Sequence, residues 1–475
     1  MGLPNVMNTG RSGMVAAKAA IATTGHNIAN ANVEGYSRQR VQQTTDVPRA
    51  IGPKAFIGTG TLISRVDRLN DPYIEKQIRN ATRDLANLEE KDIALKQTED
   101  IFNEMGGDGL NRLISRFFNE FRKLENEPSS EAVRQSVREA SQSMINDFHR
   151  IRKELEGVRT HIDSRLEGHV AEINALTEEV KDLNIKIKTQ EVGGASPNDL
   201  LDQRDQALKK LASYMDLSMH TDTDGGYIVD IRGVGPLITG GAAEKFSVHR
   251  SPADERGKPE GAYDIKSTAS ALAVVTHQLQ GGKLGGLLEV RDQTLSQVME
   301  RLDDLASTIV DSVNEIHQQG FTRNGAQGVS FFKPIEINQA SSAANFIELS
   351  DSIQSSVNNI AAAAAPSSPG DNRIAIAISR LQYQPLLEGG RATVDDYYNS
   401  IVSNVGVASA RTRSALTQQK DIHTQLNKMR DQIAGVSIDE ETANLLQFQH
   451  VFDASAKVIQ VADEMLKTVL DIKRG

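Results

Sequence analysis

The sequence predicts a mainly α-helical protein with an inserted β domain. Both chain termini are expected to form a long antiparallel helical bundle or coiled coil, and the β domain to lie on the outside. Apolar residues recur every three and four positions along several long segments, as in helices that pack through a narrow stripe. Between residues 216 and 280 short β-type runs replace this period. Apolar residues are 39% of the 475 residues and aromatic residues only 4%, which suits long helices better than one thick core.

The C-terminal segment, residues 435–475, has the most regular apolar pattern. Ser437 and Glu440 have the spacing of a capping box, so we expect a helix to begin there. The following apolar and small residues form a coiled-coil seam of more than three heptads: Leu445, Phe448, Phe452, Ser455, Ile459, Ala462, Leu466 and Val469. A second row repeats every seven residues: Val451, Val458, Met465 and Ile472. So wide an apolar face predicts more than one partner helix, the alternative being a core helix of a globular domain.

The N-terminal segment is the predicted partner of this helix. A row of large apolar residues repeats every seven positions: Met7, Met14, Ile21 and Ile28. Small residues lie beside that row and would let a second helix approach closely: Gly10, Gly13, Ala17 and Ala20.

Residues 1–70 are expected to form this helix and an extended arm. Turn-forming residues, among them Asn27, Asn30 and Gly35, end the helix, and residues 42–70 have the prolines, glycines and alternation of short strands. His26 could be a metal ligand, but no second His, Asp or Glu has suitable spacing, which favours a structural role.

Residues 71–215 are predicted to be a bundle of long helices. Asp71 and Pro72 are typical of an N-cap and a first helical position. The longest seam, residues 144–187, contains a stutter and would span roughly 65 Å as a helix. The β domain at 216–280 should contain strands near 227–231, 245–248 and 272–276, with a hairpin turn at 224–226.

Residues 281–434 are predicted to return to helices. A looser segment interrupts them at 321–392, and it contains a linker at 361–372. Thr393 and Asp396 have capping-box spacing, so a further helix should begin there and run to Gly435. The C-terminal coiled-coil helix, 435–475, follows.

Composition and motifs exclude several functions. The net charge of −10 and the lack of basic clusters argue against binding to nucleic acid. The sequence contains no run of about 18 apolar residues, so no membrane-spanning helix is predicted. Without Cys there is no thiolate metal site, and no catalytic, cofactor-binding or metal motif is present. Glu440 and Glu441 are the acidic residues that a helix N-terminus favours.

Two terminal motifs resemble the axial proteins of the bacterial flagellum, the rod, hook and hook-associated proteins. TTGHNIANANVEGYSRQ at 23–39 is similar to their N-terminal motif, and residues 435–472 are similar to their C-terminal motif. Residues 199–212 and 281–295 are similar to internal segments of a hook–filament junction member of this family.

The resemblance implies a secreted structural protein that is exported by the flagellar type III system without a cleaved signal. It implies assembly with copies of itself, with hook protein and with the second hook–filament junction protein, after a cytoplasmic export chaperone has released the C-terminal segment. The expected assembly residues are Met7, Met14, Ile21, Asn27, Ile28, Asn30, Gly35, Tyr36, Leu445, Phe448, Phe452, Ile459, Leu466 and Val469.

Two other hypotheses stay open at this point. The chain could be another axial protein, such as the second junction protein or a hook-type subunit. Alternatively, residues 216–280 could house an enzyme or a ligand-binding domain. A pocket with convergent polar groups in that domain would favour the last hypothesis.

Overall fold

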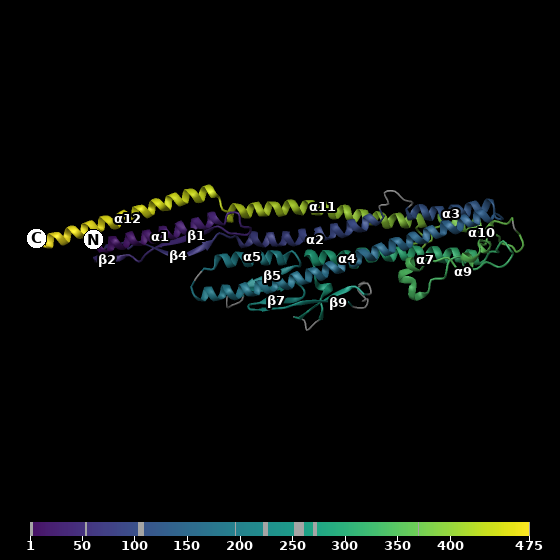
Figure 1. Cartoon of the computed structure of the whole chain (residues 1–475), viewed down its shortest axis with the longest axis horizontal. Coiled ribbons are helices and arrows are strands. Elements are labelled where there is room, and N and C mark those ends of the chain that lie inside the picture. The colour runs from purple at the N-terminus through teal and green to yellow at the C-terminus, as the bar shows by residue number, and fades with distance from the viewer. Residues whose placement is uncertain are drawn as a thin grey trace.

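The chain forms a long, narrow molecule in which helices run nearly parallel to one axis (Figure 1). This computed structural model describes residues 3–52, 55–102, 109–194, 196–221, 227–250, 261–268, 273–368 and 370–474. The predicted turn at 224–226 therefore lies outside the described residues. We call the two ends of the chain together, residues 3–68 and 438–474, the terminal unit, and residues 72–434 the body.

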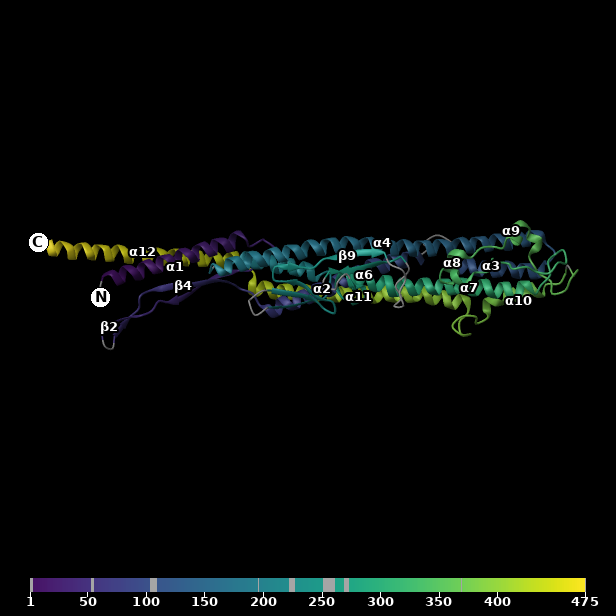
Figure 2. The same cartoon turned by 90° about the horizontal axis from the view of Figure 1, so that it is seen from below.

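The terminal unit consists of two antiparallel helices and an arm of strands. Helix α1 (Leu3–Ala29) packs along α12 (Ile438–Arg474), and both chain ends lie at the same end of the molecule (Figures 1 and 2). The arm lies beside α1 as two antiparallel ladders made by β1 (Gln39–Thr45) with β4 (Thr61–Arg68) and by β2 (Arg49–Gly52) with β3 (Ala55–Ile57). The predicted pairing of the terminal segments is confirmed.

The middle of the body is built from four long helices. α2 (Pro72–Phe102) packs against α11 (Val394–Ala434), and α4 (Glu131–Val192) packs against α5 (Asn198–Ala212). The predicted capping residues begin two of them, because Asp71 accepts from the Tyr73 N–H at 2.8 Å and Thr393 accepts from the Asp396 N–H at 3.2 Å.

Helix α4 is continuous through the predicted stutter. It has 62 residues, which corresponds to a length of about 93 Å. Apolar side chains from Val137 to Ile187 are buried along it, so it connects the two halves of the body with one stripe of core residues.

The far end of the body contains α3 (Leu110–Asn126), α7 (Ser296–Gln318) and several short helices. Its core is aromatic, with Phe117, Phe121, Phe331 and Phe332 all fully buried. The remaining helical elements are α6 (Gly282–Glu289), the π-helical turn η3 (Val290–Leu295), η4 (Ile337–Ser342), α8 (Ala343–Phe346), α9 (Asp351–Ser355), η5 (Val357–Asn359), α10 (Arg373–Arg380) and η6 (Leu381–Tyr383).

The prediction of a linker at 361–372 is wrong for the first residues of that range. Ala361 and Ala362 are 0% and 1% exposed, and the Phe321 N–H donates to the Ala363 carbonyl at 2.7 Å. Alanines fit here because Gly320 and Ile374 approach them closely, as a Cβ on Gly320 would lie 2.9 Å from both Ala361 and Ile374. Small residues that suggested a linker are instead needed for tight packing.

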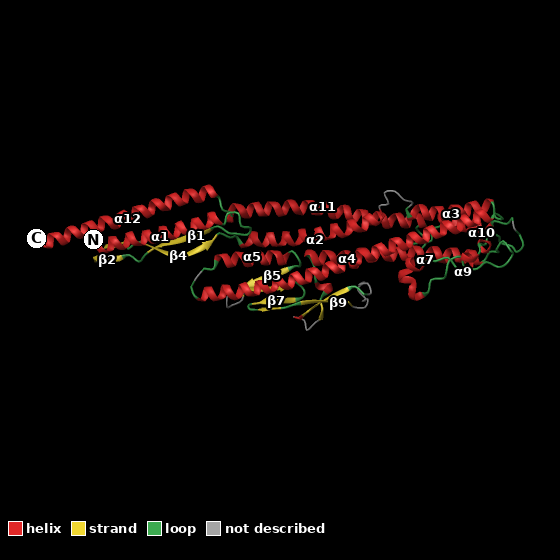
Figure 3. Ribbon diagram, viewed as in Figure 1, coloured by secondary structure: helices red, strands yellow, loops and turns green. Residues whose placement is uncertain are grey.

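The β domain lies along one side of α4 (Figure 3). Its first sheet has the order β5-β6-β7-β8 and its second the order β11-β10-β9, all antiparallel. Asn174 of α4 makes two 2.9 Å hydrogen bonds to the backbone of Phe246 and so fixes the second sheet to the helix. The strands are β5 (Leu217–Thr221), β6 (Tyr227–Ile231), β7 (Gly235–Thr239), β8 (Ala242–Ala243), β9 (Phe246–Arg250), β10 (Tyr263–Ser267) and β11 (Ala273–Val274), followed by the 3-10 turn η2 (Thr276–Gln278).

Candidate assembly surface

Glycines bring α1 and α12 into close contact. A Cβ on Gly10 would lie 2.7 Å from Cγ1 of Ile459, and a Cβ on Gly13 would lie 2.8 Å from Oγ of Ser455. A side chain at Gly10 would also approach the Ser455 backbone oxygen at 3.2 Å and so requires the helices to shift, whereas at Gly13 the Ser455 hydroxyl would have to rotate away. Ala16, Ala17 and Ala20 are buried on the same helix, so small residues make the closest part of this interface.

The contacts fix the register of the two helices. Gly10 faces Ile459, Gly13 faces Ser455 and Asn27 bonds to Glu441, so the numbers of facing residues add up to 468 or 469. Leu3 then lies level with Met465. The last part of α12 extends past α1, as Figures 1 and 2 show, which explains why Val469 is 55% exposed although the pattern placed it on the seam.

The other predicted seam residues lie partly buried between the two helices and solvent. Ala462 is 1% exposed, but none of the large apolar seam residues is as deeply buried, because one partner helix covers only part of so wide a face. This half-buried set comprises Met7, Met14, Ile21, Ile28, Leu445, Phe448, Phe452, Ile459 and Leu466.

The second apolar row of α12 is exposed. The side chains of Val451, Val458, Met465 and Ile472 are 45%, 41%, 56% and 76% exposed. Their sevenfold spacing places them on one face of the helix. The described part of a single chain therefore leaves a continuous apolar row without a partner.

A polar cluster joins the base of α1 to the start of α12. The Asn27 side chain is buried, and its amide donates to Glu441 Oε2 and to the Gln39 carbonyl, each at 2.9 Å. Its oxygen accepts from the Gln39 N–H at 2.9 Å and from the Tyr36 hydroxyl at 2.7 Å. Asn27 thus uses both the nitrogen and the oxygen of its amide. We call the cluster of Asn27, Tyr36, Arg38, Gln39, Asp202 and Glu441 the joint.

Arg38 completes the contact with α12 through two carboxylates. Its Nε donates to Glu441 Oε1 at 2.7 Å and its NH1 to Glu440 Oε2 at 2.9 Å. Glu441 is only 2% exposed, so the interpretation of this residue as a simple helix-dipole partner was incomplete. The Arg38 backbone also donates to the Ala434 carbonyl at 2.9 Å and accepts from the Leu69 N–H at 2.7 Å.

Asp202 of α5 attaches the joint to the body. Its carboxylate accepts from the Ser37 N–H and from Arg68, each at 2.9 Å. Burial raises the pKa of Asp202, although these two donors favour the ionised form. Tyr36 lies close by, where burial and the carboxylates of Asp199, Asp202 and Glu441 raise its pKa above the ordinary value, so its hydroxyl stays protonated.

The turn after α1 is shaped by the remaining motif residues. His26 Nε2 lies 3.2 Å from Asp199 Oδ1, and Asn30 Nδ2 donates to the His26 carbonyl at 3.0 Å. Gly35 has φ of +83°, and a Cβ there would overlap the Gln206 side chain. The structural role predicted for His26 fits these contacts.

Sequence reasoning missed several members of the joint, namely Arg38, Gln39, Asp202 and Glu441. The local signal was that all four lie inside segments that resemble the family: Arg38 and Gln39 in the N-terminal motif, Asp202 in 199–212 and Glu441 in the C-terminal motif. Nothing in the spacing links Asn27 to Glu441, because 414 residues separate them.

In the described ranges, no group of three or more His, Asp or Glu side chains is arranged to hold a metal ion. No described helix is long and apolar enough to cross a membrane. Helix ends, small-residue contacts and an exposed apolar row are instead the features of a surface for other proteins.

Comparison with protein families identifies the chain. The helical domain of flagellar hook-associated protein FlgK matches residues 95–332. The chain belongs to the FlgK family. It is therefore a structural component of the bacterial flagellum. The flagella basal body rod protein family matches residues 7–36, and the C-terminal family of the basal body rod proteins FlgEFG matches residues 432–472, so the terminal unit carries both motifs of the flagellar axial proteins.

Full-length relatives agree with this assignment. Flagellar hook-associated protein 1 of Bacillus subtilis is 28% identical over 98% of this chain and 97% of the relative. The proteins of the same name from Salmonella typhimurium and Escherichia coli are each 25% identical over 99% of this chain and all of the relative. A solved structure, the flagellar hook junction protein FlgK from Burkholderia pseudomallei, has the same fold, with a TM-score of 0.66 and 16% identity over 76% of this chain and 100% of that one.

Proposed function

We propose that this chain is the adaptor that joins hook to filament in the bacterial flagellum. The observation that carries the proposal is the exposed apolar row of α12, which a FlgK family member would cover by packing against further copies of itself. Hook protein on one side and the second hook–filament junction protein on the other would be its neighbours along the axis. The function is structural rather than catalytic, and the assembled protein lies outside the cell.

The same row also supports a cytoplasmic partner before export. An apolar helix face is prone to aggregation until it is covered. Burial of a side chain such as Val458 or Met465 typically contributes about 1.5–3 kcal/mol. A type III export chaperone that covers this face would therefore compete with neighbouring subunits for the same residues.

A double substitution in the row tests the proposal. Val451→Asp with Met465→Asp should leave the stability of the monomer nearly unchanged, because these side chains are 45% and 56% exposed in it. The variant should fail to attach filaments to hooks in cells and should bind the chaperone more weakly in calorimetry. The matched control is Gln449→Asp with Gln460→Asp, which adds the same charge at exposed polar positions of the same helix. Normal filament attachment by the first variant would show that this row is not an assembly surface.

A further inference from the structure

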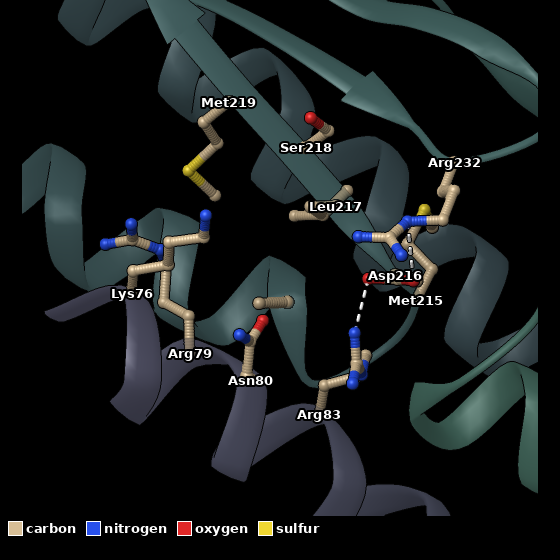
Figure 4. Close-up of a pocket in the computed structure, with 11 residues that line it drawn as sticks. Lys76, Arg79, Asn80, Arg83, Met215, Asp216, Leu217, Ser218, Met219 and Arg232 are labelled. Carbon is tan, nitrogen blue, oxygen red and sulfur yellow. Dashed lines mark hydrogen bonds and ion pairs between the residues drawn. The ribbon is translucent and has the colours of Figure 1, made fainter. Parts of the chain in front are cut away.

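A cavity of about 290 Å³ lies between α2 and the first strand of the β domain (Figure 4). One wall is the face of α2 that carries Lys76, Arg79, Asn80 and Arg83. The opposite wall is the segment 215–219, and Arg232 lies above it. The cavity is thus at the edge of the domain for which the sequence left a ligand-binding hypothesis open.

The α2 wall concentrates positive charge. Lys76, Arg79 and Arg83 follow a spacing of three and four residues, which places them next to one another on one side of the helix. Like charges at this spacing destabilise a helix. Four cations line the cavity against a single carboxylate, Asp216, in a chain whose net charge is −10.

The acidic groups nearby are already used by two of these cations. Arg83 NH1 lies 2.5 Å from Asp216 Oδ1, and its NH2 lies 2.8 Å from Asp84. Arg232 Nε binds the second oxygen of Asp216 at 3.1 Å. These ion pairs use both oxygens of Asp216, and they leave no carboxylate for the other half of the cavity.

Lys76 and Arg79 face that other half without a counter-ion. Within the part of the chain that the structure describes, neither has an Asp or Glu oxygen within 4.0 Å. Figure 4 shows the side chains of Lys76 and Arg79 extending from α2 toward the strand that carries Met219, with Asn80 further along the helix on the side of Arg83. Lys supplies a charged donor, Arg a planar fork of donors and Asn a neutral N–H, a combination that matches the oxygens of an oxyanion.

We propose that this cavity binds an oxyanion at Lys76, Arg79 and Asn80. The ligand would be either a free multivalent anion of the phosphate type or a carboxylate from an acidic segment of a neighbouring copy. The chain has 63 acidic and 53 basic residues, so acidic surface is available on any neighbour. Arg79 and Asn80 are half-buried, where charge attraction is stronger than at an open surface, whereas Lys76 is exposed at the edge of the cavity.

The first arm of the test uses the purified full-length chain and inorganic phosphate as the probe. Titration calorimetry at constant ionic strength should detect binding, and Lys76→Gln with Arg79→Gln should weaken it by at least about tenfold. The control variant, Lys96→Gln with Lys186→Gln, removes two exposed helix lysines outside the cavity and should bind like the unmodified chain. Arg83 and Asp216 stay intact in both variants, so circular dichroism should show the same fold.

The second arm distinguishes the source of the anion. A carbodiimide couples an amine to a carboxylate in direct contact, so treatment of isolated flagella should join Lys76 to an acidic residue of another copy if a neighbour fills the cavity. A mass-spectrometric link from Lys76 supports the neighbour, and phosphate binding that depends on Lys76 and Arg79 without such a link supports the free anion. Phosphate binding that is missing or unaffected by the double substitution, together with the lack of a link, would overturn the proposal. Failure of the proposed junction function would appear separately, as a chain missing from flagella.

Discussion

The terminal unit and the far end of the body are both built from helices, but they bury their aromatic side chains to very different extents. At the far end, Phe117, Phe121, Phe331 and Phe332 are fully buried, and neighbouring rings lie 4.9–6.0 Å apart. In α12, Phe448 and Phe452 are only partly buried and the row beside them is exposed. The body therefore contains the contacts it needs to fold alone, whereas the terminal unit needs surfaces from other molecules to complete its packing.

The largest effect on stability is expected when one aromatic ring in the body is truncated. Phe117→Ala should lower the free energy of unfolding by about 3–5 kcal/mol, because it removes a fully buried ring and leaves a cavity. Urea denaturation of the monomer measures the change. The same experiment on Val458→Ala, in the exposed row of α12, should give a change within about 0.5 kcal/mol. Similar losses from the two substitutions would contradict the comparison.

A smaller effect is expected when the two terminal helices are forced apart. Gly10→Val places a branched side chain against Ile459 and should destabilise the α1–α12 contact by about 1–3 kcal/mol. Hydrogen exchange should show faster opening of α1 and α12, while exchange in the body stays the same.

Gly25→Ala on the same helix is the control for this substitution. A Cβ at Gly25 would have nothing within 4 Å, and alanine favours the helix by up to about 1 kcal/mol. This variant should open no faster than the unmodified chain. If exchange in the body rises with Gly10→Val, the terminal unit and the body unfold together and are not separate units.

The third expected effect concerns pH and belongs to the body. Burial raises the pKa of Asp303 to about 6, although Arg152 and the Ala344 N–H favour the ionised carboxylate. Because the folded pKa lies above the unfolded value of about 3.9, the folded state binds the proton more tightly, and this group's contribution to stability is lost as pH rises from about 4 to 6. The slope from one such group is at most about 1.4 kcal/mol per pH unit.

Asp303→Asn tests this contribution while keeping the oxygen that accepts from Ala344 at 2.9 Å. Over the same pH range, the variant should lose less stability with rising pH than the unmodified chain in denaturant titrations. A steeper loss in the variant would mean that Asp303 is ionised in the folded state throughout this range.

Local sequence rules located the starts of the long helices well. Asp71, Thr393 and Ser437 each cap a helix as their spacing predicted, the last by accepting from the Glu440 N–H at 3.4 Å. Apolar periodicity likewise identified α4 and the pairing of α1 with α12. These features depend on residues within a few positions of one another, so a single sequence contains them.

Features that depend on contacts across the chain were not predictable in the same way. An acidic residue such as Glu441 is common in the first turn of a helix, and only the fold shows that it is buried between Asn27 and Arg38. Ala361 and Ala362 looked like a linker because small residues serve both for flexible segments and for close packing. Val469 fits the periodicity of the seam, but the register shows that α1 ends before reaching it.

The way in which the terminal unit is attached determines how it can rotate. Two separate connections of three residues each, 69–71 and 435–437, run between the terminal unit and the body. The backbone of Arg38 is hydrogen-bonded to Leu69 in the first connection and to Ala434, the last residue of α11, directly before the second. A single connection would let the terminal unit rotate freely relative to the body. Two neighbouring connections would have to wind around each other before either part could rotate. Twist applied at one end of this molecule should therefore reach the other end instead of being lost at the joint.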